Sequence, residues 1–237
     1  MNDRPGVPLL TELLRGDAGA YAQRGLFVAF EGGEGAGKST QARLLAVALI
    51  DDGYAVVETH EPGDTEVGAQ LRKIVLDPRT GVLSNRTESL LYAADKAEHV
   101  DTVVLPALDK GSVVITDRYV DSTLAYQGAG RSLARDEVER VARWATHDLR
   151  PHLTVLLDVD PETGRGRFGE PDRLEAEPTE FHARVRQGFL DLAIGDPDHY
   201  LVLDAGGSAA DLAAKIRRRV LPLLGQAVRV APSEAPS

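Results

Sequence analysis

The chain has 237 residues, enough for one α/β domain with a sizeable core, and its formal net charge of −10 argues against nucleic acid or an anionic membrane surface as the main partner. It contains no cysteine, which excludes disulfides, thiolate metal sites and cysteine nucleophiles, and no two histidines have the H-x-x-x-H spacing. No apolar run reaches the roughly 18 residues of a membrane span and the start lacks signal-peptide features, so we expect a cytoplasmic protein.

The two ends differ in composition from the rest of the chain. Residues 1–25 mix proline, glycine and charge around a short apolar patch, and we expect an extension that is a loose helix or a linker. Residues 226–237 are rich in proline and serine and are predicted to be disordered. The folded domain is therefore expected to span residues 26–225.

Short apolar runs alternate with helical patterns within this domain. Strands are predicted at 26–31, 54–59, 112–117, 153–159 and 200–205. Helices are predicted at 38–53, 87–111, 134–149, 179–194 and 209–224, with a kink at Pro106. Near-continuous apolar strands that alternate with helices indicate an α/β fold, in which a five-stranded parallel sheet is covered by helices on both faces.

The segment 31–40, EGGEGAGKST, fits the phosphate-binding loop pattern and lies between a predicted strand and a predicted helix. In such loops the lysine reaches the β- and γ-phosphates, the serine hydroxyl binds Mg²⁺, and backbone N–H groups surround the phosphates. We therefore expect a nucleoside triphosphate with Mg²⁺, held by Gly32, Gly33, Glu34, Gly35, Ala36, Gly37, Lys38, Ser39 and Thr40.

Two features of this region need an explanation. Glu34 lies in the middle of the loop, where a carboxylate repels phosphate unless it points elsewhere; a solvated loop residue is the simpler alternative. Asp117 and Arg118 follow a predicted strand, at the sheet edge where ligands of open α/β sheets bind. Asp117 can orient a magnesium water and Arg118 can bind a phosphate, although a plain salt bridge between them is the alternative.

Six segments in order make the chain resemble the thymidylate kinase family: FEGGEGAGKSTQ, EPGDT, LLYAADKAEH, DRYVDSTLAYQGAGR, LDVDPETG and DRLE. The resemblance runs from about residue 26 to about residue 224. It implies a P-loop nucleoside monophosphate kinase of the bacterial type, with a short lid at about 162–176. The implied reaction moves the γ-phosphoryl group of MgATP to dTMP, giving ADP and dTDP for dTTP synthesis. Relatives are commonly homodimers, so a homodimer is expected.

The resemblance also implies roles for residues of the acceptor site. An acidic residue at the position of Glu34 faces the deoxyribose 3′-hydroxyl in relatives. Tyr92 and Lys96, four apart on one helix face, match an aromatic ring that stacks on thymine and an arginine that binds its edge. A lysine cannot reproduce the fixed fork of that arginine. The stretch that lines the acceptor pocket in relatives here contains Ser122, Tyr126 and Gln127.

Two departures from the family affect phosphate binding. Where relatives read Arg-Glu-Pro-Gly-Gly-Thr, this chain has His60 in place of the arginine and Asp64 in place of a glycine. A histidine holds phosphate fully only when it is protonated, and the new carboxylate adds negative charge nearby. Arg72 matches a second phosphate-contacting arginine of the family and can compensate.

The lid segment RGRFGEPDRLE is a few residues shorter than in relatives, and it retains Arg165, Arg167 and Arg173. Arginines that close over a transferring phosphoryl group stabilise its charge. The predicted catalytic residues are Lys38, Asp117, Arg118, Arg167 and Arg173.

Three other functions remain open from the sequence. The departures at His60, Asp64 and Lys96 lie where a different acceptor, such as dUMP, would be selected. The same changes and the N-terminal extension are compatible with a catalytically weak, nucleotide-binding regulatory module. A generic P-loop ATPase or GTPase is opposed by the absence of an N-K-x-D-like segment.

Overall fold

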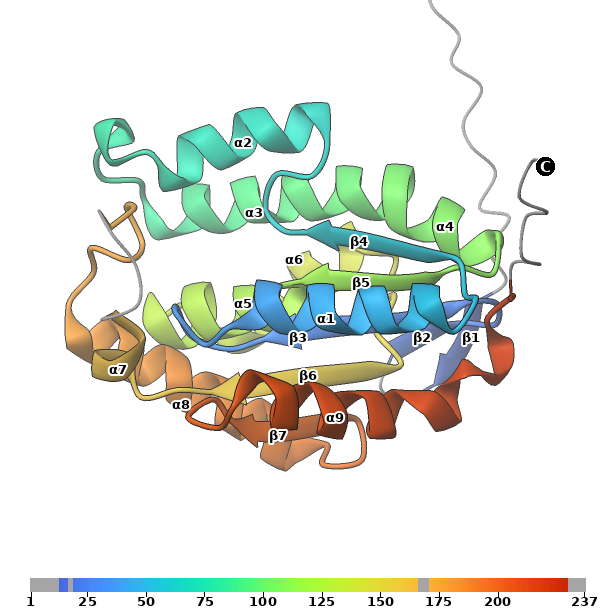
Figure 1. Ribbon diagram of the computed structural model, residues 1–237. Helices are drawn as coiled ribbons and strands as arrows, with labels where there is room; N and C mark the ends of the chain where they lie inside the picture. Colours follow the sequence, from blue (N-terminus) through green and yellow to red (C-terminus); the bar gives the residue numbers. More distant parts are fainter. Residues whose placement is uncertain (1–12, 17–18, 166–170, 230–237) are drawn as a thin grey trace, which may run out of the picture.

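The computed structural model describes residues 13–16, 19–165 and 171–229. Within these residues, five parallel strands form one sheet in the spatial order β4, β5, β3, β6, β7 (Figure 1). The strands are β3 (Leu26–Glu31), β4 (Val56–His60), β5 (Val113–Asp117), β6 (Leu153–Asp158) and β7 (Tyr200–Asp204). The predicted parallel sheet is confirmed, and its strands lie close to the ranges expected from the sequence.

Helices connect the strands. They are α1 (Lys38–Asp51), α2 (Glu66–Leu76), α3 (Asn85–His99), α4 (Leu105–Asp109), α5 (Val120–Thr123), α6 (Arg135–Ala145), α7 (Pro161–Arg165), α8 (Thr179–Gly195) and α9 (Ala209–Val220), with 3₁₀ segments at Pro78–Thr80 and Leu221–Gln226. Helix α2 is absent from the predicted elements, although Thr65 caps it by accepting a 2.8 Å hydrogen bond from the Gly68 N–H. Across the described part of the chain, no helix is long and apolar enough to cross a membrane.

The long helix predicted over 87–111 is interrupted. Helix α3 ends at His99, the five residues Val100–Val104 form a π-helical segment, and α4 follows. Pro106 lies in α4, where it lacks a backbone N–H and its ring crowds the carbonyl four residues earlier. The irregularity predicted at Pro106 thus takes the form of a widened turn just before it.

The central strand β3 contributes to cores on both faces of the sheet. Val28 and Phe30 pack into a core shared with α1 and α9, whereas Phe27 and Ala29 pack into a second core shared with α4. Figure 1 shows α1 and α9 on the near face of the sheet. Because alternate residues of a strand point to opposite faces, a strand covered on both sides must be apolar throughout.

The described part of the predicted N-terminal extension is a β-hairpin, so the expectation of a loose helix or linker is wrong for it. Strand β1 (Leu13–Gly16) pairs antiparallel with β2 (Gly19–Ala22). The buried Ala20 donates its N–H to the Asp148 carbonyl at 2.8 Å and accepts from the Arg150 N–H at 2.7 Å. The hairpin is therefore docked on the domain by long-range backbone contacts, which local sequence patterns do not reveal.

Two residues of the predicted C-terminal tail, Val228 and Arg229, contact the rest of the domain. The Val228 N–H donates to the Gly111 carbonyl at 2.9 Å, and the Arg229 guanidinium lies 5.0 Å from the centre of the Tyr54 ring. The remainder of the predicted tail, 230–237, lies outside the described residues.

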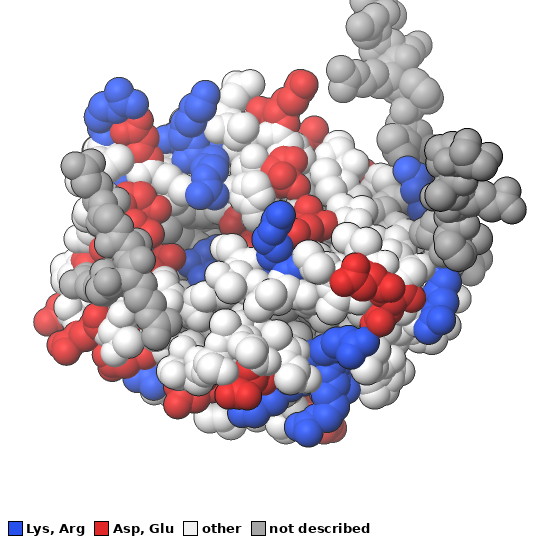
Figure 2. All heavy atoms as spheres, in the orientation of Figure 1, with Lys and Arg blue, Asp and Glu red and all other residues white. Residues whose placement is uncertain are grey.

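Acidic and basic side chains are interspersed over the face that carries α1 and α9 (Figure 2). On this face Arg217 of α9 pairs with Asp52, just after α1, at 2.7 Å. Exposed pairs of this kind contribute little to stability. The acidic residues on this face therefore have basic residues as neighbours.

The register of the sheet gathers the predicted site residues at one edge. Asp117, the last residue of β5, lies beside Phe30 of β3 and His60 of β4. The glycine-rich loop after β3, Glu61 after β4 and Arg118 after β5 therefore start side by side, at the carboxyl edge where ligands of such sheets bind.

Candidate active site

The loop between β3 and α1 has the conformation of a phosphate-binding loop. Gly35 and Gly37 have φ angles of 69° and 90°, and a Cβ at Gly35 would collide with the Gly164 carbonyl. Lys38 begins α1, is 6% exposed, and donates from Nζ to the Gly33 carbonyl across the loop at 2.9 Å. A buried ammonium inside a glycine-rich turn at a helix N-terminus favours a bound phosphate.

Ser39 and Asp117 meet beside this loop. The Ser39 hydroxyl donates to Oδ2 of Asp117 at 2.5 Å. The second carboxylate oxygen, Oδ1, is buried and has no hydrogen-bond partner within the described residues. A hydroxyl beside such an oxygen fits Mg²⁺, which prefers oxygen ligands and keeps waters and phosphates in its shell. The described residues contain no cluster of three or more acidic, histidine or cysteine side chains that could hold a metal ion.

Glu34 points out of the phosphate loop. Its Oε1 accepts hydrogen bonds from the Arg118 guanidinium at 2.6 Å and from the Tyr126 hydroxyl at 2.7 Å. Burial raises the pKa of Glu34, but Arg118, Lys38 and the two hydrogen bonds outweigh it and lower the pKa to about 2. The second carboxylate of the loop thus also lines the neighbouring smaller cavity, where Arg118 and Tyr126 hold it.

Arg118 lies between two cavities and lines both. The larger, of about 770 Å³, extends from the phosphate loop; the smaller, of about 130 Å³, lies beside α3. The residue has a φ of 70°, and its guanidinium donates to the Gly32 carbonyl at 3.2 Å and to the Ser122 hydroxyl at 3.1 Å. A fixed guanidinium at this junction can bind phosphates that enter from either side.

Glu31 holds the backbone around Arg118 and is absent from the predicted site. Its Oε1 accepts from the backbone N–H groups of Tyr119 at 2.8 Å and Ser122 at 3.1 Å. Its Oε2 accepts from the Ser122 hydroxyl at 2.6 Å. Burial, and next the nearby Asp121, raise the pKa of Glu31 to about 7. The signal available from the sequence is a single carboxylate that ends an otherwise apolar strand.

The smaller cavity contains the predicted acceptor residues except His60. Those that line it are Glu34, Arg72, Tyr92, Lys96, Arg118, Ser122, Tyr126 and Gln127. They come from the phosphate loop, α2, α3, the strand end after β5, helix α5 and the π-helical segment Leu124–Gly130. Residues far apart in sequence therefore converge on one pocket, and π-helical turns are common at such functional sites.

Tyr92 presents an aromatic ring to this cavity. It is 7% exposed, and its buried hydroxyl has no partner within the described residues. Burial, and then the charge of Glu88, raise the pKa of Tyr92, so the phenol stays neutral. Gln127 is held nearby by a 3.0 Å hydrogen bond from its amide to Glu88. The position of this ring in the cavity wall is compatible with the predicted stacking on a planar base.

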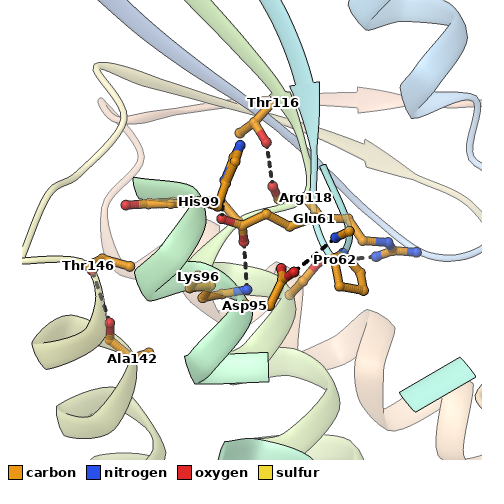
Figure 3. A network of polar contacts seen from close by, with 12 residues as sticks. Glu61, Pro62, Asp95, Lys96, His99, Thr116, Arg118, Ala142 and Thr146 are labelled. Atoms are coloured by element: carbon orange, nitrogen blue, oxygen red, sulfur yellow. Dashed lines mark hydrogen bonds and ion pairs between the residues drawn. The ribbon is translucent and has the colours of Figure 1, made fainter. Parts of the chain in front are cut away.

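Lys96 is fixed rather than flexible. Its Nζ lies 2.7 Å from Oε2 of Glu61, and both residues are buried, at 2% and 3% exposure (Figure 3). Burial raises the pKa of Glu61, but Lys96 and then His99 outweigh it and hold the pKa below its usual range. The ion pair thus gives this ammonium the fixed position that an arginine would obtain from its planar fork.

His60 and Asp64 lie together at the phosphate side. His60 lines the larger cavity, and its Nδ1 is 3.5 Å from Asp64 Oδ1. The other Asp64 oxygen accepts from the Thr59 hydroxyl, so both carboxylate oxygens have contacts. Arg72 is exposed, lines both cavities and donates to the Pro62 carbonyl at 2.6 Å, after a cis Glu61–Pro62 bond.

Arg173 lies at the base of the predicted lid. The Arg173 guanidinium donates to the Val75 carbonyl at 2.7 Å and to Glu88 at 2.5 Å. In this conformation Arg173 therefore anchors the base of the lid to α2 and α3. Arg167 lies outside the described residues, and the structure describes no side chain for Arg165.

Three buried glutamates, together with the half-buried Glu34, thus shape the site: Glu31, Glu61 and Glu88. Glu61 lies within the EPGDT segment and Glu88 in the predicted long helix, but a single acidic residue in either context is normally solvated. Only the three-dimensional contacts show that each one holds a basic or backbone group of the site.

Comparisons with known proteins agree with this geometry. A family model described as thymidylate kinase matches residues 30–216. The thymidylate kinase of Cutibacterium acnes is 56% identical over 202 residues, covering 85% of this chain and 99% of that protein. The thymidylate kinase of Leifsonia xyli subsp. xyli is 54% identical over 200 residues, covering 83% and 94%. A crystal structure of thymidylate kinase from Ehrlichia chaffeensis aligns with a TM-score of 0.69 at 29% identity, covering 84% of this chain and 99% of that one.

Proposed function

The chain belongs to the thymidylate kinase family, and we propose from this premise how its residues carry out the reaction. It is an enzyme that transfers the γ-phosphoryl group of ATP to dTMP, giving ADP and dTDP. The observation that carries the residue-level proposal is the position of Arg118, whose guanidinium lines both the phosphate-loop cavity and the cavity beside α3.

The donor side is the phosphate loop. Lys38 and the loop N–H groups bind the β- and γ-phosphates of ATP. Ser39 and Asp117 would hold Mg²⁺, with the hydroxyl as one ligand and the buried Oδ1 of Asp117 orienting its water. When bound, the ion neutralises charge on the phosphate oxygens.

The acceptor phosphate is bound between Arg118 and Arg72, with His60 at the phosphate side. A phosphate monoester has a second pKa of about 6, so the attacking oxygen is already largely ionised at neutral pH and needs no general base. Catalysis then consists of positioning the two phosphates and neutralising their charge. In this proposal Arg118 contacts the reacting groups directly.

The sugar and base occupy the smaller cavity. Glu34, ionised and fixed by Arg118, accepts from the deoxyribose 3′-hydroxyl. The Tyr92 ring stacks on the base. Lys96 donates to a carbonyl oxygen at the base edge, and the amide of Gln127 closes the pocket behind it. Ser122 and Tyr126 act mainly by holding Arg118 and Glu34.

The lid retains a predicted role. Arg165 and Arg167 are proposed to approach the transferring phosphoryl group, whereas Arg173 anchors the lid base through Glu88. We also propose that the enzyme acts in the cytoplasm, where ATP is available.

A homodimer is proposed through α3 and α6. A groove between these helices is lined by Leu90, Leu133 and Val141 among other residues, and Leu90 is 58% exposed. A second copy would cover these apolar side chains. Light scattering of the wild type and of L90E tests this: a dimer that L90E dissociates supports the proposal, and a wild-type monomer at micromolar concentration contradicts it.

The function is tested by ADP formation with MgATP and each of dTMP, dUMP, UMP, dCMP and dGMP. We expect selectivity for dTMP, and a loss of roughly 10²–10³-fold in Lys38→Ala, the effect of removing one charge-stabilising donor. Lys215→Ala is the matched control, because Lys215 is exposed on α9. Turnover with another acceptor only, or equal turnover without an acceptor, would contradict the proposal.

A further inference from the structure

A chain of polar contacts runs from Lys96 in the smaller cavity to Asp64 at the phosphate side. Glu61 contacts Lys96 through one oxygen and His99 Nδ1 through the other, each at 2.7 Å (Figure 3). His99 Nε2 lies 2.6 Å from the Thr59 hydroxyl, which also contacts Asp64. Glu61, Lys96 and His99 are each at most 3% exposed.

The hydrogen bonds of this chain need one more proton than the side chains carry when His99 is neutral and both carboxylates are ionised. Glu61 is ionised, since Lys96 and His99 lower its pKa despite burial, so His99 Nδ1 must carry a proton to donate to it. The Thr59 oxygen contacts both Nε2 of His99 and Oδ2 of Asp64. Each contact needs a proton, and the hydroxyl owns only one. The second proton must be on His99 Nε2 or on Asp64.

The surroundings favour His99 as the site of this proton. The His99 ring is buried between two oxygen acceptors, those of Glu61 and Thr59, whereas the Asp64 side chain is 35% exposed. An imidazolium donates from both nitrogens, to Glu61 and to the Thr59 oxygen, and Thr59 then donates to Asp64. Both ends of this chain of hydrogen bonds are charge-assisted.

Three further titratable groups lie near His99: Lys96, Asp95 and Tyr119. On its own helix, Lys96 opposes the imidazolium and Asp95 supports it when ionised. Burial, and then Glu61, raise the pKa of Asp95 to about 6. From the segment after β5, Tyr119 faces Glu61 and is neutral, because burial raises the pKa of its phenol. The charges that favour the imidazolium therefore outnumber Lys96.

We propose that His99, protonated with the help of Asp64, is a positioning residue that locks the Glu61–Lys96 pair and so determines which base edge the cavity accepts. This inference rests on the proposed function. Within the described residues Nζ of Lys96 makes one hydrogen bond, to Glu61, so two of its three N–H donors remain for a ligand. They accept a carbonyl oxygen at the base edge, as in thymine, and reject an amino group, as in cytosine.

Asp64→Asn removes the negative charge and supplies a donor, because its amide N–H can donate to the Thr59 oxygen and Thr59 can then donate to a neutral His99 Nε2. The first measurement is ¹⁵N NMR of histidine side chains in the wild-type enzyme at pH 7.5, with His99→Gln to assign the signal. We expect both nitrogens of His99 to be protonated in the wild type and only Nδ1 in Asp64→Asn. A neutral His99 in the wild type would overturn the proposal.

The second measurement is the ratio of kcat/KM for dTMP to that for dCMP. We expect this ratio to fall about tenfold in Asp64→Asn and in His99→Gln, well short of the roughly 10⁴-fold that a fully lost polar contact can cost. A weaker His60–phosphate contact would affect both substrates equally and leave the ratio unchanged. Asp136→Asn, exposed on α6, is the charge-matched control.

The two proposals fail in distinguishable ways. If the wild type does not phosphorylate dTMP, the proposed function fails, and without it the selectivity role of His99 falls as well. If the wild type is selective for dTMP but the ratio is unchanged in Asp64→Asn and in His99→Gln, only the positioning role is overturned.

Discussion

The carboxylate of Glu34 accepts a hydrogen bond from the guanidinium of Arg118 at 2.6 Å, although one belongs to the phosphate loop and the other follows strand β5. The pair joins the donor and acceptor sides of the site at a point that both cavities share. Ionised Glu34 fixes the guanidinium and keeps an acceptor in the smaller cavity. The loop can therefore hold a triphosphate without repulsion from its own glutamate.

Glu34→Gln is expected to lower kcat/KM for dTMP by roughly 10- to 100-fold, the size of one lost charge-assisted hydrogen bond, while the KM for ATP changes little. The amide keeps the shape of the side chain but lacks the charge that pairs with Arg118. Steady-state kinetics with varied dTMP and varied ATP measure both effects, with Glu180→Gln on the exposed start of α8 as control. Wild-type kcat/KM for dTMP in Glu34→Gln would show that Glu34 does not orient the acceptor.

Glu31→Gln is expected to reduce dTMP turnover without destabilising the fold at alkaline pH. One amide oxygen cannot replace two carboxylate oxygens that hold Tyr119 and Ser122, so the Arg118 backbone loosens. Burial raises the pKa of Glu31 to about 7, above its ordinary 4.5. The stability from this group is therefore fully present below pH 4.5 and is lost as pH rises through about 7.

Melting temperatures at pH 5 and pH 8 test whether this stability is lost as the pH rises. Since glutamine does not titrate, Glu31→Gln should gain stability relative to the wild type between these two pH values. A stability difference that does not change with pH would contradict the raised pKa. Wild-type kinetics in this variant would contradict the role of Glu31 in holding Arg118.

The sequence predicted those parts of the site that depend on local order. The loop residues and the pair Asp117 and Arg118 follow strands directly, and parallel strands bring their carboxyl ends to one edge. The ion pair of Lys96 with Glu61 and that of Arg173 with Glu88 join segments 35 and 85 residues apart. Such partners are chosen by burial and packing, which local patterns do not contain.

Glu88→Gln is expected to destabilise the enzyme by about 3 kcal/mol, because it leaves two guanidinium groups without their buried counter-charge. Glu88 is 1% exposed and accepts from Arg131, Arg173 and Gln127. Urea unfolding measures the change, and the KM for dTMP should rise because the lid base and Gln127 lose their anchor. Glu180→Gln, on the exposed start of α8, is the control. Equal stability of the two variants would contradict this assignment.

The stability of the folded enzyme at acid pH depends in part on the buried His199. His199 is 8% exposed, and its Nε2 lies 3.1 Å from the Thr154 hydroxyl. Burial, and next the charge of Arg150, lower the pKa of His199 to about 4, from an ordinary 6.5. The unfolded chain therefore binds a proton at higher pH than the folded chain does. Stability from this group is present above pH 6.5 and is lost as pH falls through about 4.

The full loss amounts to about 3 kcal/mol for a shift of this size. His199→Gln can keep a contact to Thr154 but cannot bind that proton, so its unfolding free energy should fall less steeply than that of the wild type between pH 6.5 and 4.5. Urea unfolding of both proteins at these two pH values measures the slope difference, in which titrations shared by both proteins cancel. Equal slopes would mean that the pKa of His199 is not lowered in the folded enzyme, which would contradict this prediction.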